Sequence, residues 1–263
     1  MEIFNSSNIP DLKEGETIVP LFTLDTFLLP EDQMMMRVFE PRYKQMLDDI
    51  VLDGLPYGHV ISNLSMPELN GISVPYDVGV LVEINQFQEQ GSNLLYLANG
   101  GKRFRINSLI EPALEPEFFN SIFPSVDELV GEYIDEYPKG KLYVRGIVEV
   151  VPELVGEINS ERWNYILSLW KSYIEIIAEI NEMEVTDLDI DNEVDNMFPI
   201  PEVKSLWKLA ALILDSIEAQ TLSLKAENVE EICSLIESNI QKKIAAVRPV
   251  SYTHLTLPTI RSV

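Results

Sequence analysis

Two short stretches place basic and aromatic side chains next to each other in a predominantly acidic chain. Residues 37–44 read RVFEPRYK, and residues 100–106 read GGKRFRI. Positive charge beside aromatic rings is typical of nucleic-acid surfaces, of sites for small anions and of charged anchors beside a core. The chain has 43 acidic and 19 basic residues and a formal net charge of −24. A field of this sign repels a polyanion, so it argues against nucleic acid as a partner.

The second stretch does not form a phosphate-binding loop. Such a loop requires a glycine, four further residues and then Gly-Lys-Ser/Thr. Here Arg103 stands where the hydroxyl is required, and Tyr96 stands in place of the first glycine. We therefore expect no nucleotide cofactor.

Residues 187–195, DLDIDNEVD, space their carboxylates as a calcium loop does. The turn glycine is replaced by Asn192 and the closing glutamate by Phe198, and both changes remove what that loop needs. We expect a solvated acidic loop between helices and no bound metal.

Nucleophilic catalysis or zinc binding would depend on very few side chains. His59 lies within a strand pattern and Cys233 on an apolar helix face, which indicates a structural histidine and a buried cysteine. No carboxylates can be paired for acid–base chemistry from their spacing alone. We therefore predict no catalytic residues and no enzymatic activity.

Residues from Thr17 to about Pro152 have the pattern of strands. The expected strands are 17–22, 34–39, 57–64, 78–87, 94–98, 102–110 and 141–151. Asn99-Gly100 predicts a hairpin turn, and residues 88–92 predict a second hairpin loop. A helix should begin at Pro41. Residues 111–138 stay unassigned, apart from a capping box formed by Ser125 and Glu128.

After Asn159 the apolar period changes to that of helices. Three apolar faces follow, and they contain all three tryptophans, so we expect these rings in the core of a helical bundle. The expected faces are Trp163, Ile166, Leu167, Trp170, Ile174 and Ile177; Val203, Leu206, Trp207, Ala210, Ile213, Leu214 and Ile217; and Val229, Ile232, Cys233, Ile236, Ile240 and Ile244.

Both ends of the chain differ from the rest. Residues 1–16 show no clear period and are interpreted as a loose leader. Residues 250–259, VSYTHLTLPT, resemble a translated sequencing adapter, so we expect 250–263 to be an adapter-derived tail that does not pack. Pro249 should end the last helix at about that point.

Composition places the chain among ordinary globular proteins. Its single cysteine fits a reducing compartment, and its apolar runs are too short for a membrane span. Its first residues lack the pattern of a signal peptide. We expect a cytoplasmic protein with no membrane partner. The sequence specifies no client and no oligomeric state.

Two segments in fixed order resemble one known family. PLFTLDTFLLPEDQMMMRVFEPRYKQML (20–47) and VGVLVEINQFQEQGSNLLYLANGGKRFRI (78–106) are similar to the Lon N-terminal, or substrate-binding, domain family, in its small free-standing form. The helical part is similar more weakly. Glu31-Asp32 departs from the family, in which a glycine commonly follows the proline. The residues that carry the resemblance are Val38, Phe39, Glu40, Pro41, Arg42, Tyr43, Gly100, Gly101, Arg103, Phe104 and Arg105.

This resemblance implies an α+β fold, with a PUA-like β pseudo-barrel (17–155) followed by a small helical bundle (156–249). It implies a non-catalytic module that binds extended or unfolded polypeptide in protein quality control. Met34, Met35 and Met36 are candidates for polypeptide contact, although the same residues also fit a barrel core. Two alternatives stay open. In the first alternative, the chain is the front part of an ATP-dependent Lon protease. In the second, it is an RNA-binding protein that uses the PUA-like barrel.

The motif residues themselves favour anchoring over ligand contact. Pro41 and Tyr43 should fix and pack the first helix, and Arg42 should be held by Glu40 or another carboxylate. Because strand side chains alternate, Arg103 and Arg105 should share one face and Phe104 should enter the core from the other.

Overall fold

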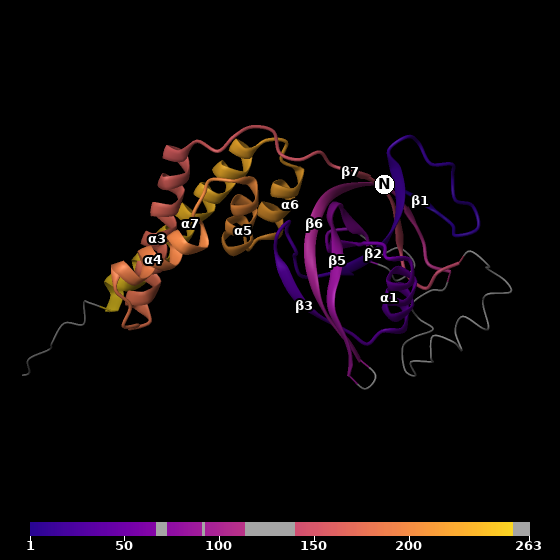
Figure 1. Ribbon diagram of the computed structural model, residues 1–263, viewed down its shortest axis with the longest axis horizontal. Helices are drawn as coiled ribbons and strands as arrows, with labels where there is room; N and C mark the ends of the chain where they lie inside the picture. Colours follow the sequence, from indigo (N-terminus) through magenta and orange to yellow (C-terminus); the bar gives the residue numbers. More distant parts are fainter. Residues whose placement is uncertain (67–72, 91–92, 114–139, 255–263) are drawn as a thin grey trace, which may run out of the picture. The chain divides into compact units, whose positions relative to one another are not determined.

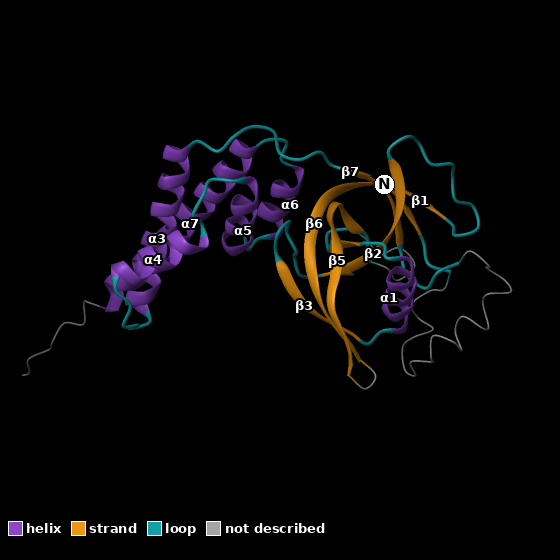
Figure 2. Cartoon of the chain, in the orientation of Figure 1, coloured by secondary structure: helices purple, strands orange, loops and turns teal. Residues whose placement is uncertain are grey.

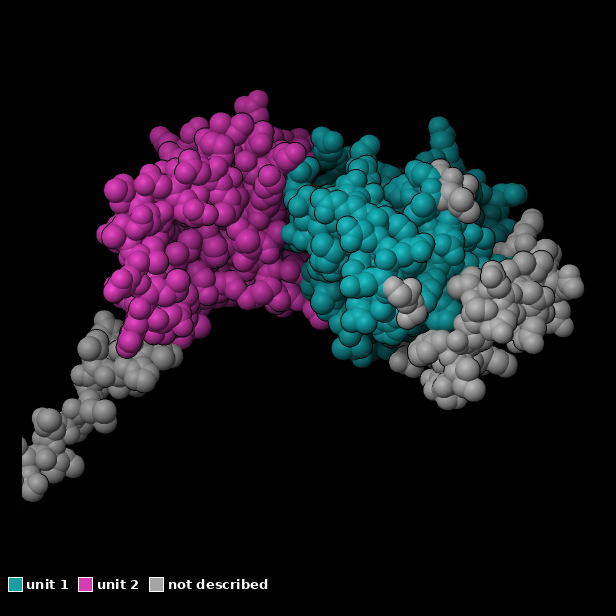
Figure 3. Space-filling view, turned by 60° about the horizontal axis from the view of Figure 1, so that its bottom comes forward, with its two compact units in different colours: residues 1–153 teal, residues 154–263 magenta. Residues whose placement is uncertain are grey.

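The computed structural model describes residues 1–66, 73–90, 93–113 and 140–254, and it divides into two compact units. Unit 1 is Met1–Glu153 and unit 2 is Leu154–Val263 (Figure 3). The described strands and one helix belong to unit 1, and the other described helices belong to unit 2 (Figure 2). The predicted α+β class is confirmed. The proposed capping box of Ser125 and Glu128 lies outside the described residues.

A seven-stranded mixed sheet forms unit 1 (Figure 1). Its strands are β1 (Glu2–Phe4), β2 (Glu16–Leu24), β3 (Gln33–Val38), β4 (Tyr57–Ser62), β5 (Pro75–Gln90), β6 (Asn93–Ile110) and β7 (Arg145–Val150). The pairings pass from β6 through β5, β4, β2 and β7 and return to β6. β1 and β3 pair with β6 as well. One long strand therefore contacts four others.

The continuity of β6 corrects the expected hairpin at Asn99-Gly100. Both residues lie inside β6, so the two strands predicted at 94–98 and 102–110 are one. β5 and β6 pair antiparallel where the second hairpin was expected, but residues 88–90 of the predicted loop belong to β5, whose last residue, Gln90, pairs with Asn93.

Gly100 is required by a close backbone contact and not by a turn. A Cβ atom at this position would lie 2.0 Å from the carbonyl oxygen of Leu29. The amide of Glu31 donates to the Gly100 carbonyl at 2.9 Å, and the Gly100 amide donates to the Asp32 carbonyl at 2.9 Å. These bonds form a β-bulge in which two residues oppose one. The first of them, Glu31, has a φ of 63°. Glycine is favoured at that bulge position, which accounts for the family's glycine there.

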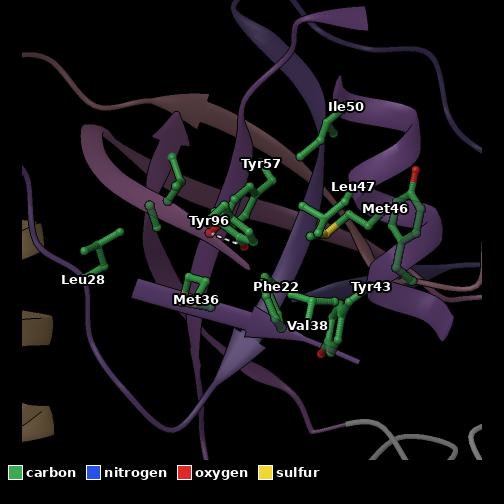
Figure 4. Close-up of a cluster of buried hydrophobic side chains, with 13 residues drawn as sticks. Phe22, Leu28, Met36, Val38, Tyr43, Met46, Leu47, Ile50, Tyr57 and Tyr96 are labelled. Atoms are coloured by element: carbon green, nitrogen blue, oxygen red, sulfur yellow. Dashed lines mark hydrogen bonds between the residues drawn. The ribbon is translucent and has the colours of Figure 1, made fainter. Parts of the chain in front are cut away.

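The larger core cluster of unit 1 lies beneath helix α1 (Pro41–Asp53) and is shown in Figure 4. Three strands contribute Phe22, Tyr57 and Tyr96, and the last two rings meet edge to face. Their hydroxyls are hydrogen-bonded at 3.0 Å inside the core. Gly54 ends α1 in the left-handed conformation. The helix predicted at Pro41 is confirmed.

The start of the chain corrects the interpretation of residues 1–16 as a loose leader. β1 pairs in parallel with β6, from Glu2 opposite Ser108 to Phe4 opposite Ile110. The Ser6 hydroxyl donates to the Glu111 carbonyl at 2.7 Å, and Ser6 is buried. A three-residue strand is too short for any periodicity to show in the sequence.

Unit 2 consists of helices in its described part. They are α3 (Ser160–Ile180), α4 (Asp187–Met197), α5 (Val203–Ile213), α6 (Ile217–Lys225) and α7 (Val229–His254). Trp163 and Trp207 are buried as predicted, whereas Trp170 is half-buried and stacks on Tyr173 with ring centroids 5.5 Å apart. Among the described helices, none combines the length and the hydropathy needed to cross a bilayer.

Two expectations for unit 2 were wrong. Residues 187–195 form most of α4 and not a loop, because Thr186 and Asp189 form a capping box that starts the helix and Ile190 and Val194 are buried. α7 continues past Pro249 to His254, since an internal proline removes one donor without necessarily ending a helix. The rest of the expected tail, 255–263, lies outside the described residues.

We expect Gly100→Ala to lower the free energy of unfolding by about 3 kcal/mol, because the new methyl group meets a backbone oxygen that cannot move aside. Gly101→Ala is the matched control. Its Cβ would lie 3.1 Å from the Leu81 carbonyl oxygen, and the residue is exposed, so we expect a loss below about 1 kcal/mol. Urea unfolding of the two variants measures the difference. Equal losses would contradict the role given to Gly100.

Candidate functional site

The first motif, 38–43, connects β3 to α1. Val38 is buried in the core, and Phe39 is 52% exposed. Glu40 precedes the helix with extended backbone angles, and Pro41 occupies its first turn. The expected ion pair is present: Glu40 Oε2 accepts from Arg42 Nη2 at 2.7 Å and from Arg42 Nε at 2.8 Å. Both side chains are about one-third exposed, so the pair contributes less than about 1 kcal/mol.

Tyr43 is the structural anchor of this motif. Its ring is buried, lies 4.0 Å from the Phe22 ring between centroids, and has the Arg42 guanidinium carbon 4.8 Å from its own centroid. Its hydroxyl donates to the Thr23 carbonyl. Burial raises the pKa of the Tyr43 hydroxyl, so the group stays neutral near pH 7. Tyr43, with Arg42 over its ring, therefore attaches α1 to the sheet, whereas Phe39 is exposed.

The second motif, 100–106, packs around Phe104. This ring is fully buried, and Cβ atoms at Gly58 and Gly79 would lie 2.7 and 2.6 Å from its Cζ atom. The prediction that Phe104 enters the core is confirmed. The glycines on β4 and β5 make the space that the ring fills.

Arg103 is buried, which its alternation with Phe104 does not indicate. Its Nη2 donates to the Pro152 carbonyl at 2.7 Å, and its own carbonyl accepts from the Val151 amide at 2.9 Å. Burial lowers the pKa of the Arg103 guanidinium from its ordinary value, and the group stays charged at neutral pH. Arg105 is exposed, so the two arginines have different environments.

The structure does not bring the two basic stretches into one site. In the β3–β6 ladder Val38 pairs with Leu94, and Gln33 pairs with Asn99 beside Gly100. The motifs thus begin at opposite ends of a six-residue strand, which spans about 17 Å. A single anion site made from both stretches is excluded by this distance.

The three candidate methionines have three different environments. Met36 is buried in the core, as the barrel-core interpretation of these residues expects. Met34 is partly buried against the same cluster. Met35 is 65% exposed. Strand alternation, which the residue types alone do not reveal, separates Met35 from the other two.

The remaining candidate groups belong to the scaffold. His59 is buried with Nε2 2.6 Å from the Thr26 carbonyl oxygen, and desolvation lowers the pKa of the imidazole. Cys233 is buried, and burial raises the pKa of its thiol to about 11, far from that of a nucleophile. Across the described ranges, no three His, Cys, Asp or Glu side chains gather as metal ligands would.

Comparison with known proteins assigns the family. The sequence model described as the ATP-dependent protease La (LON) substrate-binding domain matches residues 18–236. The chain belongs to this family, and the resemblance found in the sequence is confirmed. No curated protein has a sequence that matches this chain.

Two solved structures share the fold. The crystal structure of a Lon N-terminal domain protein from Xanthomonas campestris is 20% identical, with a TM-score of 0.52 over 87% of this chain and 98% of that one. The N-terminal domain of the Mycobacterium avium complex Lon protease is 15% identical, with a TM-score of 0.51 over 86% and 98%. At these identities the likeness concerns the fold.

We expect Arg103→Ala to lower the free energy of unfolding by about 2 kcal/mol, because the Pro152 carbonyl loses its charged donor and the packed side chain is removed. Arg105→Ala, two residues along the same strand and exposed, should stay within about 0.5 kcal/mol of the parent protein. Thermal or urea unfolding compares the two. A loss confined to Arg105→Ala would contradict the assignment of Arg103 as the anchor.

Proposed function

We propose that this chain is a non-catalytic module that binds extended or unfolded polypeptide in protein quality control. The observation that carries this proposal is the match of residues 18–236 to a substrate-binding domain of an ATP-dependent protease. A protease substrate must be unfolded to be degraded processively, so its binding module has to recognise features shared by many extended chains.

The chemistry of the motif residues supports binding without catalysis. Burial is the first cause of the shifted pKa values of Tyr43, His59, Arg103 and Cys233, and each is buried in the scaffold. The less buried groups Glu16, Lys171 and Asp189 owe their pKa shifts first to hydrogen bonds with neighbouring residues of the chain. A catalytic acid or base must reach its substrate, and the four buried groups do not.

The finer architecture and setting are part of the same proposal. The cycle of strand pairings through β6, β5, β4, β2 and β7 supports a PUA-like pseudo-barrel. We place the protein in the cytoplasm. PUA-like folds also suggest RNA, but fold analogy is weak support and the net charge of −24 opposes it.

A second candidate rests on the same family match: the chain is the substrate-binding part of a longer ATP-dependent protease. The gene sequence downstream separates the two candidates. A nucleotide-binding loop within a few hundred residues would establish the longer protease, and its absence would establish the free-standing module.

The binding proposal is tested by fluorescence anisotropy. The labelled ligand is a client protein other than this chain, a small disulfide-bonded protein that is supplied in two forms. We expect the reduced, carbamidomethylated and permanently unfolded form to bind, and the native disulfide-bonded form not to bind. Two ligands are controls. Labelled single-stranded RNA should show no rise in anisotropy when the protein is added, and ATP should not raise the melting temperature of the protein. RNA binding that weakens steeply with salt, or equal binding of both protein forms, would overturn the proposal.

A further inference from the structure

β3 is an edge strand whose outer side has no strand partner among the described residues. It pairs only with β6, which is already paired with β5 along the same residues: Ala98 lies opposite Met34 of β3 and Ile84 of β5. Figure 1 shows β3 beside β6 at the margin of the sheet. Edge strands expose a row of main-chain donors and acceptors.

The bulge at Glu31 determines which main-chain groups point outward. Gly100 donates to the Asp32 carbonyl, so Asp32 and Gly100 form a hydrogen-bonded position of the ladder. Hydrogen-bonded and non-hydrogen-bonded pairs alternate in antiparallel strands, which makes Met34, Met36 and Val38 the residues bonded to β6. The amides and carbonyls of Met35 and Arg37 therefore point to the open edge. Gln33 also points outward, but its amide donates to Asp32 Oδ1 at 2.8 Å.

The side chains on this strand alternate in the same way. Met36 and Val38 are buried, whereas Met35 and Arg37 of β3 and Phe39, the residue that follows the strand, are exposed. Arg37 forms no ion pair with a described residue, although carboxylates outnumber basic groups in the chain. The open edge thus carries, in order, an apolar, a cationic and an apolar side chain on one face.

We infer that the open edge of β3 binds extended polypeptide by antiparallel strand addition, with a preference for the pattern apolar–x–acidic–x–apolar. Main-chain bonds to Met35 and Arg37 hold any extended segment. The acidic residue lies opposite Arg37, and the apolar residues lie opposite Met35 and Phe39. This inference rests on the proposed function and names the site and the sequence preference that serve it.

A second copy of this chain fits the same edge less well. Two β3 strands paired antiparallel about Met35 would place Arg37 opposite Gln33, which has no carboxylate. Pairing about Met34 would place Arg37 opposite Glu31, which lies outside β3 and has a φ of 63°, so the ladder would have to extend past the strand into the bulge. Two chains of net charge −24 also repel each other. A client segment with one acidic residue and basic flanks fits better. Its acidic residue pairs with Arg37, and its basic flanks are attracted by the negative net charge of the chain.

The probe is the dye-labelled peptide Lys-Leu-Ser-Glu-Ser-Leu-Lys, with Lys-Leu-Ser-Lys-Ser-Leu-Lys as its charge-swapped partner. Met35→Pro removes the outward amide of Met35 without removing a bond to β6, so the fold should persist while affinity for the first peptide falls about tenfold. Met35→Thr keeps the amide and controls for the side chain, with a smaller loss. Arg37→Glu should lower the affinity for the first peptide. The same variant should bind the charge-swapped peptide, whose lysine then lies opposite the new carboxylate.

Amide hydrogen exchange gives a readout independent of affinity. Saturating peptide should slow the exchange of Met35 and Arg37 and leave Met36 and Val38, already bonded to β6, unchanged. If the unfolded protein binds the parent chain and Met35→Pro equally and Arg37→Glu has no charge-specific effect, the edge is not the site, and the proposed function survives. If no unfolded chain binds, both fail. A dimer that Met35→Pro abolishes would assign the edge to a second copy and overturn the inference.

Discussion

The contact between the Leu29 carbonyl and Gly100 is the constraint on which unit 1 depends. It brings residues 29–32 across β6 at a distance that no side chain at position 100 permits. The two hydrogen bonds that follow create the bulge at Glu31 and determine the register of β3 against β6. That register in turn decides which residues of β3 enter the core and which face outward.

β6 transmits this constraint to the rest of the sheet. The same strand pairs with β1, β3, β5 and β7. Between the pairs Val80–Arg103 and Val82–Gly100, it has one residue more than β5, so the sheet is irregular beside the crossing. The family motif at 100–106 therefore serves mainly to build this strand, and the motif at 38–43 attaches α1 to the end of β3. We therefore assign binding to the exposed surface of β3, which these two motifs hold in place.

Local signals in the sequence predicted α1, most strands and most of the buried helix faces, although Ile217 is exposed and Trp170 is half-buried. Three features differ from these predictions. Asn99-Gly100 has the residue types of a turn, but glycine is required at position 100 because the Leu29 carbonyl, about seventy residues earlier in the chain, leaves no room for a side chain. Arg103 and Arg105 were expected on one face, yet only Arg103 is buried, because Pro152 supplies its acceptor from beyond β7. Residues 187–195 look solvated until Ile190 and Val194 are seen to be buried. The first two features depend on tertiary contacts, which spacing along the chain does not contain, whereas the third also has a local signal in the capping box of Thr186 and Asp189.

Native-state hydrogen exchange along β6 tests the central claim that one continuous strand, held at Gly100, organises the unit. We predict that the hydrogen-bonded amides on both sides of Gly100, from Tyr96 to Ile106, exchange with one free energy, equal to that of global unfolding. Two separate free energies, with the half before Gly100 opening independently of the half after it, would show two strands joined by a turn and would contradict this account.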